Sequence, residues 1–130
     1  FETVMSHESK VKFLKDAQEQ GYRTYLYFVT TEDPDINVDR VKQRVKNGGH
    51  PVEENKIRER YFRSMEMLID AIEVSDRAFL YDNSSNAVDQ SVSYICEVTN
   101  GDTLTINPCF KGDFPIWFEK YVLVHLVDED

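Results

Sequence analysis

The feature that most restricts the fold is a pair of short apolar runs, each preceded by sequence with helical periodicity. Residues 24–30 read TYLYFVT and residues 77–81 read RAFLY, and both are rich in β-branched and aromatic side chains. Continuous runs of this length are typical of strands buried in a parallel sheet. Because strands that alternate with helices form α/β folds with right-handed crossovers, we expect a parallel sheet with flanking helices.

Three helices are expected from capping residues and apolar spacing. Ser6 is a candidate N-cap for a helix over about 7–20, and Asp33-Pro34 is a strong start for a helix that ends at Gly48-Gly49. A third helix is expected over about 53–75, because its apolar residues recur every three or four positions. The expected buried residues are Val38, Val41 and Val45 in the second helix and Ile57, Tyr61, Met65, Leu68 and Ile72 in the third.

The last third of the chain predicts a hairpin and one ambiguous segment. Two β-prone stretches flank Asn100-Gly101, which is a strong two-residue turn signal, so residues 92–107 are expected to form a β-hairpin. Residues 114–126 fit either a helix or a helix that continues into a strand. Trp117 within this segment is expected to lie in the core rather than on a stacking surface.

Length and composition fit one domain over residues 1–130. The chain is 41% hydrophobic, which excludes wholesale disorder. Cys96 and Cys109 lack metal-ligand spacing, and two free, partly buried thiols are expected. No apolar run approaches the roughly 20 residues of a membrane-spanning helix, and no signal peptide is recognisable. These features favour a cytoplasmic protein without a membrane partner.

The charge is distributed unevenly. Residues 39–63 carry eight basic and four acidic side chains, a net charge of +4, whereas the whole chain carries −9. The remaining segments therefore carry −13, which argues against a nucleic-acid partner. A local basic segment in an acidic protein fits a compact anion such as a nucleotide or a phosphorylated metabolite. The alternative is a solvated helical face with intrahelical ion pairs, for example between Glu59 and Arg63.

Several segments resemble one family. Residues 40–52 read RVKQRVKNGGHPV and residues 57–64 read IRERYFRS, and they resemble the zeta-toxin-like P-loop kinases, in particular bacterial proteins often called predicted ABC-type ATPases. Residues 1–6 and 81–84 share the resemblance, which covers about residues 1–86. It implies a P-loop kinase-like fold that uses ATP and Mg²⁺ to phosphorylate a hydroxyl of a small substrate. Better-studied zeta toxins phosphorylate UDP-N-acetylglucosamine.

The resemblance also implies roles for individual residues, with residues 39–63 as an arginine-rich lid. The candidates are Arg60 and Arg63 for catalysis, Arg40, Arg44, Asp82 and Asn83 for ATP, and Glu2, Thr3 and His50 for the substrate. No metal ligand is assigned. Arginine suits phosphate because its guanidinium is planar and always charged. The alternatives are surface ion pairs for the arginines, a turn-stabilising role for His50 and ordinary polar strand ends for the others.

One departure from the family is large. The sequence contains no G-x-x-x-x-G-K-[ST] motif. By the resemblance, the P-loop, its Mg²⁺-binding hydroxyl and the general base would lie upstream of Phe1, so the parent protein is expected to be a kinase and this chain alone to be inactive. The missing P-loop strand would leave unpaired strand edges, through which the chain could associate with another copy. The alternative is a non-catalytic nucleotide- or protein-binding module. Whether a kinase parent is a toxin with an antitoxin partner or a metabolic enzyme stays open.

Overall fold

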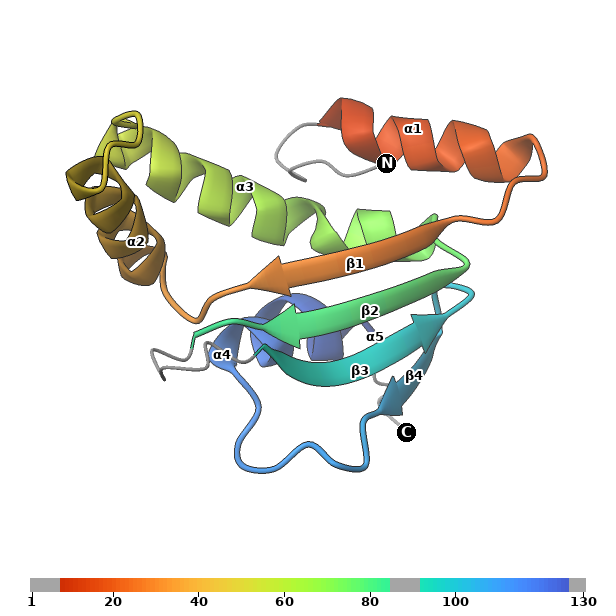
Figure 1. The fold of residues 1–130 in the computed structure, drawn as a ribbon. Helices are drawn as coiled ribbons and strands as arrows, with labels where there is room; N and C mark the ends of the chain where they lie inside the picture. Colours follow the sequence, from red (N-terminus) through yellow and green to blue (C-terminus); the bar gives the residue numbers. More distant parts are fainter. Residues whose placement is uncertain (1–7, 85–91, 127–130) are drawn as a thin grey trace.

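A four-stranded sheet forms the centre of the protein. The computed structural model describes residues 8–84 and 92–126. The strands are β1 (Tyr25–Thr30), β2 (Arg77–Asp82), β3 (Ser93–Thr99) and β4 (Thr103–Ile106), and they lie in this order across the sheet (Figure 1). β1 pairs with β2 in parallel, and β3 pairs with β2 and with β4 in antiparallel orientation.

The prediction of a parallel sheet is therefore correct for the β1–β2 pair and wrong for the other two strand pairs. The hairpin is present where it was expected, and Asn100 and Gly101 take the positive φ angles of 55° and 75° that this turn requires. The structure shows, however, that β3 continues the main sheet directly from β2. Antiparallel neighbours need no crossover helix, so the chain between β2 and β3 can be short. The hairpin thus makes half of the sheet.

The helices begin and end close to the expected positions. They are α1 (Glu8–Glu19), α2 (Pro34–Lys46) and α3 (Glu54–Glu73). The Asp33 carboxylate accepts a hydrogen bond from the amide of Asp35 at 2.8 Å, which is the predicted N-cap of α2. The ambiguous segment is helical: α4 (Ile116–Phe118) leads into a π-helical turn, η1 (Glu119–Leu123), and then into α5 (Val124–Leu126).

The core lies between one face of the sheet and the helices. The predicted stripe of α3 is buried along its whole length, and Trp117 is buried as expected. Leu68 of α3 and Phe118 of α4 belong to the same buried cluster as Leu26 and Leu80 of the sheet, so α3 and the α4–α5 segment cover the same face. In α2 only Val38 of the three predicted valines is buried, and Val45 is exposed.

The opposite face of the sheet is not covered by any helix in the described ranges. In β1 alternate residues are buried, and Tyr25, Tyr27 and Val29 are 46%, 65% and 51% exposed. The expectation that this apolar run is buried therefore holds for one of its two faces. Across the described helices, none is long and apolar enough to cross a membrane.

Candidate functional site

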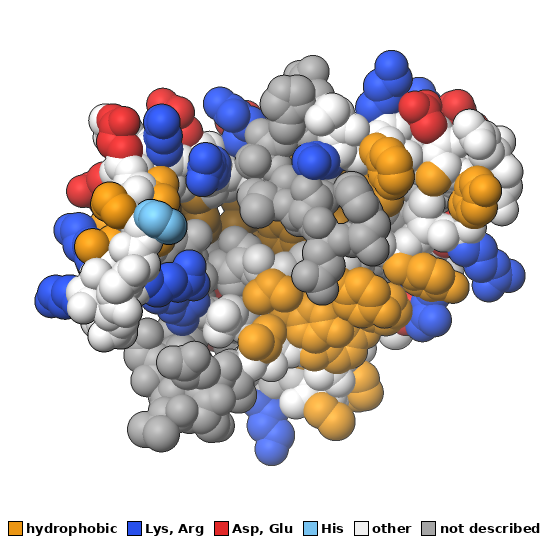
Figure 2. Space-filling view, turned by 45° about the horizontal axis from the view of Figure 1, so that its top comes forward, with side chains coloured by type: hydrophobic (Ala, Val, Ile, Leu, Met, Phe, Trp, Pro, Cys, Tyr) orange, Lys and Arg blue, Asp and Glu red, His pale blue; other side chains and the backbone are white. Residues whose placement is uncertain are grey.

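A hollow of about 850 Å³ runs along the edge of β1 that faces away from β2, where no described strand pairs with it (Figure 2). Every residue from Tyr25 to Thr31 lines it. The other walls come from α1, α2, α3 and Asn83, which directly follows β2. Because β1 and β2 are parallel, their carboxyl ends meet at the same end of the hollow. Ligands of open α/β sheets bind at this position.

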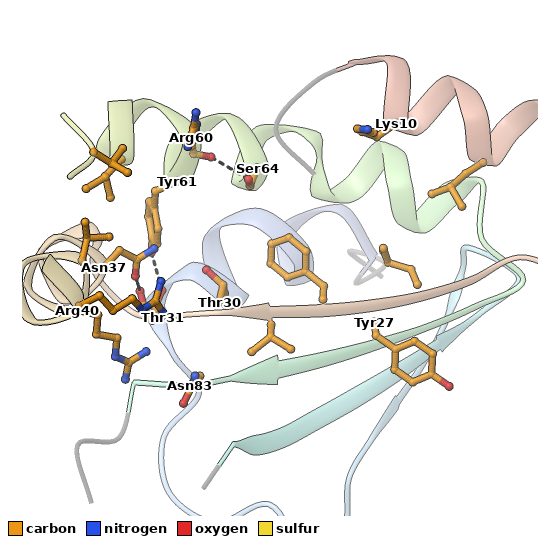
Figure 3. Close-up of a pocket in the computed structure, with 18 of the residues that line it drawn as sticks. Lys10, Tyr27, Thr30, Thr31, Asn37, Arg40, Arg60, Tyr61, Ser64 and Asn83 are labelled. Atoms are coloured by element: carbon orange, nitrogen blue, oxygen red, sulfur yellow. Dashed lines mark hydrogen bonds between the residues drawn. The ribbon is translucent and has the colours of Figure 1, made fainter. Parts of the chain in front are cut away.

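All charged side chains that line the hollow in the described part of the chain are basic. They are Lys10 of α1, Arg40 and Arg44 of α2, and Arg60 of α3. Figure 3 shows Arg40 at the carboxyl end of β1, Arg60 on α3 above it, and Lys10 on α1. Within a chain of net charge −9, the four basic side chains gather positive charge along this hollow.

The polar groups at the end of β1 are held by short hydrogen bonds. The Thr31 hydroxyl lies 2.6 Å from Oδ1 of Asn37, and the Tyr61 hydroxyl donates to the carbonyl of Thr31 at 2.7 Å (Figure 3). Burial raises the pKa of the Tyr61 phenol above its usual range, and the nearby charge of Asp33 raises it further. The phenol therefore stays protonated and remains a donor.

Hydrogen bonds also join the ends of β1 and β2. The amide of Asn83 donates to the carbonyl of Thr30 at 2.7 Å, and the amide of Glu32 donates to the Ser84 hydroxyl at 2.8 Å. The Asn83 side-chain oxygen is buried and has no hydrogen-bond partner among the described residues. A buried acceptor without a partner is costly, so the end of the hollow retains unused hydrogen-bonding capacity.

The structure brings only some of the predicted site residues together. Arg40, Arg44, Arg60 and Asn83 line the same hollow. Arg63 is not among the residues that line this hollow and instead lines a smaller groove on α3 beside Phe62 and Glu66. The remaining candidates are placed as follows: Asp82 and His50 are outside the lining of the hollow, and Glu2 and Thr3 fall outside the described residues.

Asp82 makes hydrogen bonds within the fold and does not line the hollow. Its carboxylate accepts a hydrogen bond from the Trp117 indole at 2.8 Å and another from the Ser84 amide at 2.9 Å. His50 is exposed in the connection between α2 and α3, directly after Gly49. The structure therefore gives neither residue a place in the lining of the hollow.

Several residues of the hollow were not predicted from the sequence. Lys10, Asn37, Tyr61 and Ser64 all line it. A helical spacing signal was available for two of them, because Asn37 lies three positions before Arg40 and Ser64 four positions after Arg60. The Ser64 hydroxyl donates to the carbonyl of Arg60 at 2.8 Å. Lys10 comes from a distant helix, so spacing could not have identified it.

Part of the basic segment is used in structural ion pairs. Arg58 contacts Asp35 at 2.5 Å and Glu54 at 2.9 Å, and hydrogen bonds to these two carboxylates raise its pKa, Asp35 contributing most. Arg58 thereby joins the first turn of α2 to the first turn of α3. Surface ion pairing, the predicted alternative for this basic segment, therefore describes Arg58, which pairs with Asp35 and Glu54.

The residues that line the hollow fit a polyphosphate but not a metal ion. Mg²⁺ prefers carboxylate, carbonyl and water oxygens. In the described ranges, no three His, Cys, Asp or Glu side chains are grouped so that they could hold a metal. Guanidinium and ammonium groups bind phosphate oxygens directly. Any Mg²⁺ that accompanied a nucleotide would therefore need ligands other than the described side chains of the hollow.

The protein is a mixed α/β domain with an arginine-lined hollow at the carboxyl ends of two parallel strands. Comparison with known proteins narrows this class. Residues 1–92 match the zeta toxin family, and the chain belongs to that family.

A relative from Haemophilus influenzae, described as an uncharacterized protein, is 35% identical over 60 residues. The matched stretch covers 46% of this chain and 43% of that protein, so it spans less than half of either. No solved structure matches the chain.

Proposed function

We propose that the hollow binds the phosphates of a nucleotide, and that the whole protein is an ATP-dependent small-molecule kinase of zeta-toxin type. The observation that carries the proposal is that, among the described residues, every charged side chain lining the hollow is basic, with Arg40, Arg44 and Arg60 drawn from two neighbouring helices. Phosphoryl transfer depends mainly on positioning and on neutralising charge at the phosphate oxygens. Membership in the zeta toxin family supports the same reaction class.

The proposed division of roles follows the geometry. Arg40 and Arg44, four positions apart on α2, would hold phosphate oxygens from one side, and Arg60 on α3 would approach from the other. Asn83, with its unused side-chain oxygen, would accept a hydrogen bond from the ligand. The acceptor would be a hydroxyl of a small, nucleotide-sugar-like substrate, bound by Glu2, Thr3 or His50. Arg63 is retained only as a secondary candidate, because it lines a different groove.

These 130 residues do not supply every group that the reaction needs. The sequence has no Walker A motif, so the P-loop lysine and the metal-binding hydroxyl would come from residues outside it. ATP, when bound, supplies the transferable phosphoryl group, and this chain's arginines would neutralise its charge. We expect the 130-residue chain to bind polyphosphate without transferring phosphate from ATP. An antitoxin partner belongs to the same proposal for the whole protein.

Arg60 and Arg63 provide a matched test, since they lie on the same helix but line different hollows. We expect inorganic tripolyphosphate to bind the chain in low salt, and Arg44→Ala and Arg60→Ala each to weaken binding by about three- to tenfold. Arg63→Ala should change the affinity by less than about twofold. Isothermal titration calorimetry measures all four proteins. Equal losses for Arg60→Ala and Arg63→Ala, or no binding by the unmodified chain, would contradict the proposed site.

The alternative is a non-catalytic module that binds nucleotides or proteins. It would use the same basic lining without the phosphoryl transfer that a Walker A motif supports. It differs from the kinase proposal in what happens when the chain is joined to the residues encoded upstream in its gene. If that longer protein transfers phosphate from ATP to a sugar nucleotide, the module alternative fails. If it binds ADP without any turnover, the kinase proposal fails.

A further inference from the structure

Helix α2 is attached to the rest of the protein mainly through its first turns. Pro34 and Val38 are its buried residues, and residues 42–46 are all exposed. Among the described residues, no side chain of α2 belongs to the buried core cluster that contains Leu68 of α3. Figure 1 shows α2 at the carboxyl end of β1, beside the beginning of α3. Because few apolar contacts hold α2, its direction depends strongly on the polar contacts near its first turn.

Arg58 of α3 makes the ion pairs that reach this first turn. Its Nη2 contacts Asp35 of α2 at 2.5 Å and Glu54 of its own helix at 2.9 Å. The same oxygen of Glu54 also accepts a hydrogen bond from Nε of Arg58 at 3.3 Å. A guanidinium that one carboxylate holds at two nitrogens keeps a fixed orientation towards a second carboxylate. Asp35, Glu54 and Arg58 together are called the Arg58 bridge below.

The arginines of α2 that line the hollow lie further along the helix than this bridge. Arg40 is five positions and Arg44 nine positions after Asp35, which places them about 7 and 13 Å further along the helix axis. A tilt of about 10° at the first turn would therefore move the backbone by about 1 Å at Arg40 and about 2 Å at Arg44. Hydrogen bonds to phosphate oxygens weaken steeply over such a displacement. Of the two arginines, Arg44 is accordingly the more sensitive to the direction of α2.

A second contact from α3 holds the chain just before α2. The Tyr61 hydroxyl donates to the carbonyl of Thr31 at 2.7 Å, and Thr31 lies three positions before Pro34. Tyr61 and Arg58 are three positions apart on α3, so both side chains leave the same side of that helix. A single contact at the entry to α2 would leave the helix able to tilt about it. The Arg58 bridge adds a contact within the first turn and so restricts this tilt.

We propose that the Arg58 bridge sets the direction of α2 relative to α3 and thereby holds Arg44 in the lining of the same hollow as Arg60. Arg58 is a positioning residue, because it does not line the hollow and acts on a bound anion through Arg44. Exposed ion pairs contribute little to the free energy of unfolding, so loss of the bridge should alter the arrangement of α2 more than the stability of the chain. The effect on anion affinity rests on the proposed phosphate site, whereas the effect on the direction of α2 needs no ligand.

Removal of one negative charge at either of two positions on α2 separates positioning from simple electrostatics. Asp35→Asn and Asp39→Asn both make the chain less negative, which by electrostatics alone strengthens the binding of tripolyphosphate. We expect Asp35→Asn instead to weaken binding about two- to fourfold in calorimetric titration, because it breaks the Arg58 bridge. Asp39→Asn is the matched control and should bind at least as tightly as the unmodified chain. Asp35→Glu retains the carboxylate and should stay within about twofold of the unmodified chain.

A double-mutant comparison tests whether the effect passes through Arg44. In an Arg44→Ala background, Asp35→Asn should no longer weaken tripolyphosphate binding, because the side chain that the bridge positions is missing. In an Arg60→Ala background it should keep its effect, because Arg60 lies on α3 and does not move with α2. Equal effects in the two backgrounds would contradict the proposal.

A distance measurement without ligand tests the bridge directly. Spin labels at Lys46→Cys on α2 and Asp70→Cys on α3, both exposed positions, report the direction of α2 relative to α3. Cys109→Ser is the background, because Cys109 is exposed and Cys96 is buried. Lys46 is 11 positions after Asp35, so a tilt of about 10° moves it by about 3 Å. Pulsed electron paramagnetic resonance should show a distance distribution that Asp35→Asn shifts or broadens by about this amount and Asp39→Asn leaves unchanged.

An unchanged distance distribution in Asp35→Asn would overturn the proposal, and so would binding of tripolyphosphate by Asp35→Asn that is as tight as that of the unmodified chain. Circular dichroism melting shows whether the fold is retained, and Asp35→Asn should shift Tm by less than about 4 °C. If Asp35→Asn unfolds, Arg58→Gln replaces it in the distance measurement. If the unmodified chain does not bind tripolyphosphate but Asp35→Asn changes the distance, the phosphate site fails and the role of the bridge stands. Failure of one proposal is therefore distinguishable from failure of the other.

Discussion

The Trp117 indole N–H donates to the buried carboxylate of Asp82 at 2.8 Å and so joins α4 to the last residue of β2. Asp82 accepts a second bond from the amide of Ser84, which places the chain just after β2 at the end of the hollow. The residue that the sequence suggested as a nucleotide ligand is therefore part of the support of the site. The Asp82 carboxylate accepts hydrogen bonds from two donors, whereas an asparagine at this position would have only one acceptor oxygen.

Substitutions at Asp82 should show how much each of these two hydrogen bonds contributes to the free energy of unfolding. Asp82→Ala leaves the indole and the Ser84 amide without an acceptor and should lower the free energy of unfolding by about 2–4 kcal/mol. Asp82→Asn keeps one acceptor and should cost about half as much. Urea unfolding monitored by the fluorescence of the single tryptophan measures both. Equal effects of the two substitutions would show that only one of the two hydrogen bonds contributes to stability.

The turn of the hairpin makes a close contact with α3, and glycine substitution should reveal it. A Cβ at Gly101 would lie 3.0 Å from both the Cα and the carbonyl oxygen of Glu73, and Gly101 has a φ of +75°. Gly112 has a φ of +91° and open space around it. Gly112→Ala should cost about 1 kcal/mol from backbone strain alone, and Gly101→Ala about 2–3 kcal/mol. Thermal unfolding measures the difference, and equal losses would rule out the steric contribution.

The two thiols should react very differently. Cys96 is buried in the sheet and Cys109 is exposed. A thiol reagent at pH 8 should modify one thiol per native chain, at Cys109, and two in denaturant. Cys109→Ser should abolish the native reaction, whereas Cys96→Ala should leave it intact. Rapid modification of two thiols without denaturant would mean that β3 opens readily.

Burial of Cys96 should also make the free energy of unfolding depend on pH. It raises the pKa of the Cys96 thiol from 9.0 to about 12, so the folded chain keeps the proton that the unfolded chain loses first. The stabilising contribution is complete below about pH 9 and is lost as the pH rises towards 12. Relative to Cys96→Ala, the unmodified chain should lose about 1–1.5 kcal/mol of its advantage between pH 8 and pH 10. Urea unfolding at both pH values tests this, and a constant difference would contradict it.

Much of the fold could be predicted because local signals and tertiary packing agree. Asp33-Pro34, Gly48 and Asn100-Gly101 act through backbone geometry that depends on few distant contacts. The α3 stripe was identifiable because helical spacing alone defines its buried face. Strand direction could not be predicted in this way. Whether β3 lies beside β2 or apart from it depends on pairing between distant residues, and a hairpin has the same sequence pattern in either case.

The candidate site was predictable only in part, for a related reason. Helical spacing groups Arg40 with Arg44, but it cannot show that Arg60 lines the same hollow as these two residues while Arg63 lines a different groove. Lys10 and Asn83 reach the hollow from elements that are distant in sequence. The uncovered face of β1 had no local signal either, because a continuous apolar run has the same composition whether one face or both faces are covered.

The Tyr61 hydroxyl joins α3 to the carboxyl end of β1, and its removal should lower both the stability of the fold and the affinity for anions. Tyr61→Phe keeps the buried ring but removes the donor to the Thr31 carbonyl, so it should lower the free energy of unfolding by about 1–2 kcal/mol. Because burial raises the pKa of the phenol, the unmodified chain should also lose stability relative to Tyr61→Phe as the pH rises above about 10, where the unfolded phenol ionises. Release of Thr31 should loosen its contact with Asn37 and weaken tripolyphosphate binding by about two- to threefold. Tyr22→Phe, which removes the hydroxyl of a tyrosine that is 67% exposed and does not line the hollow, is the control and should change neither quantity. Unfolding at pH 7 and pH 11, together with calorimetric titration, gives the comparison, and unchanged anion affinity in Tyr61→Phe would show that the Thr31 contact does not organise the site.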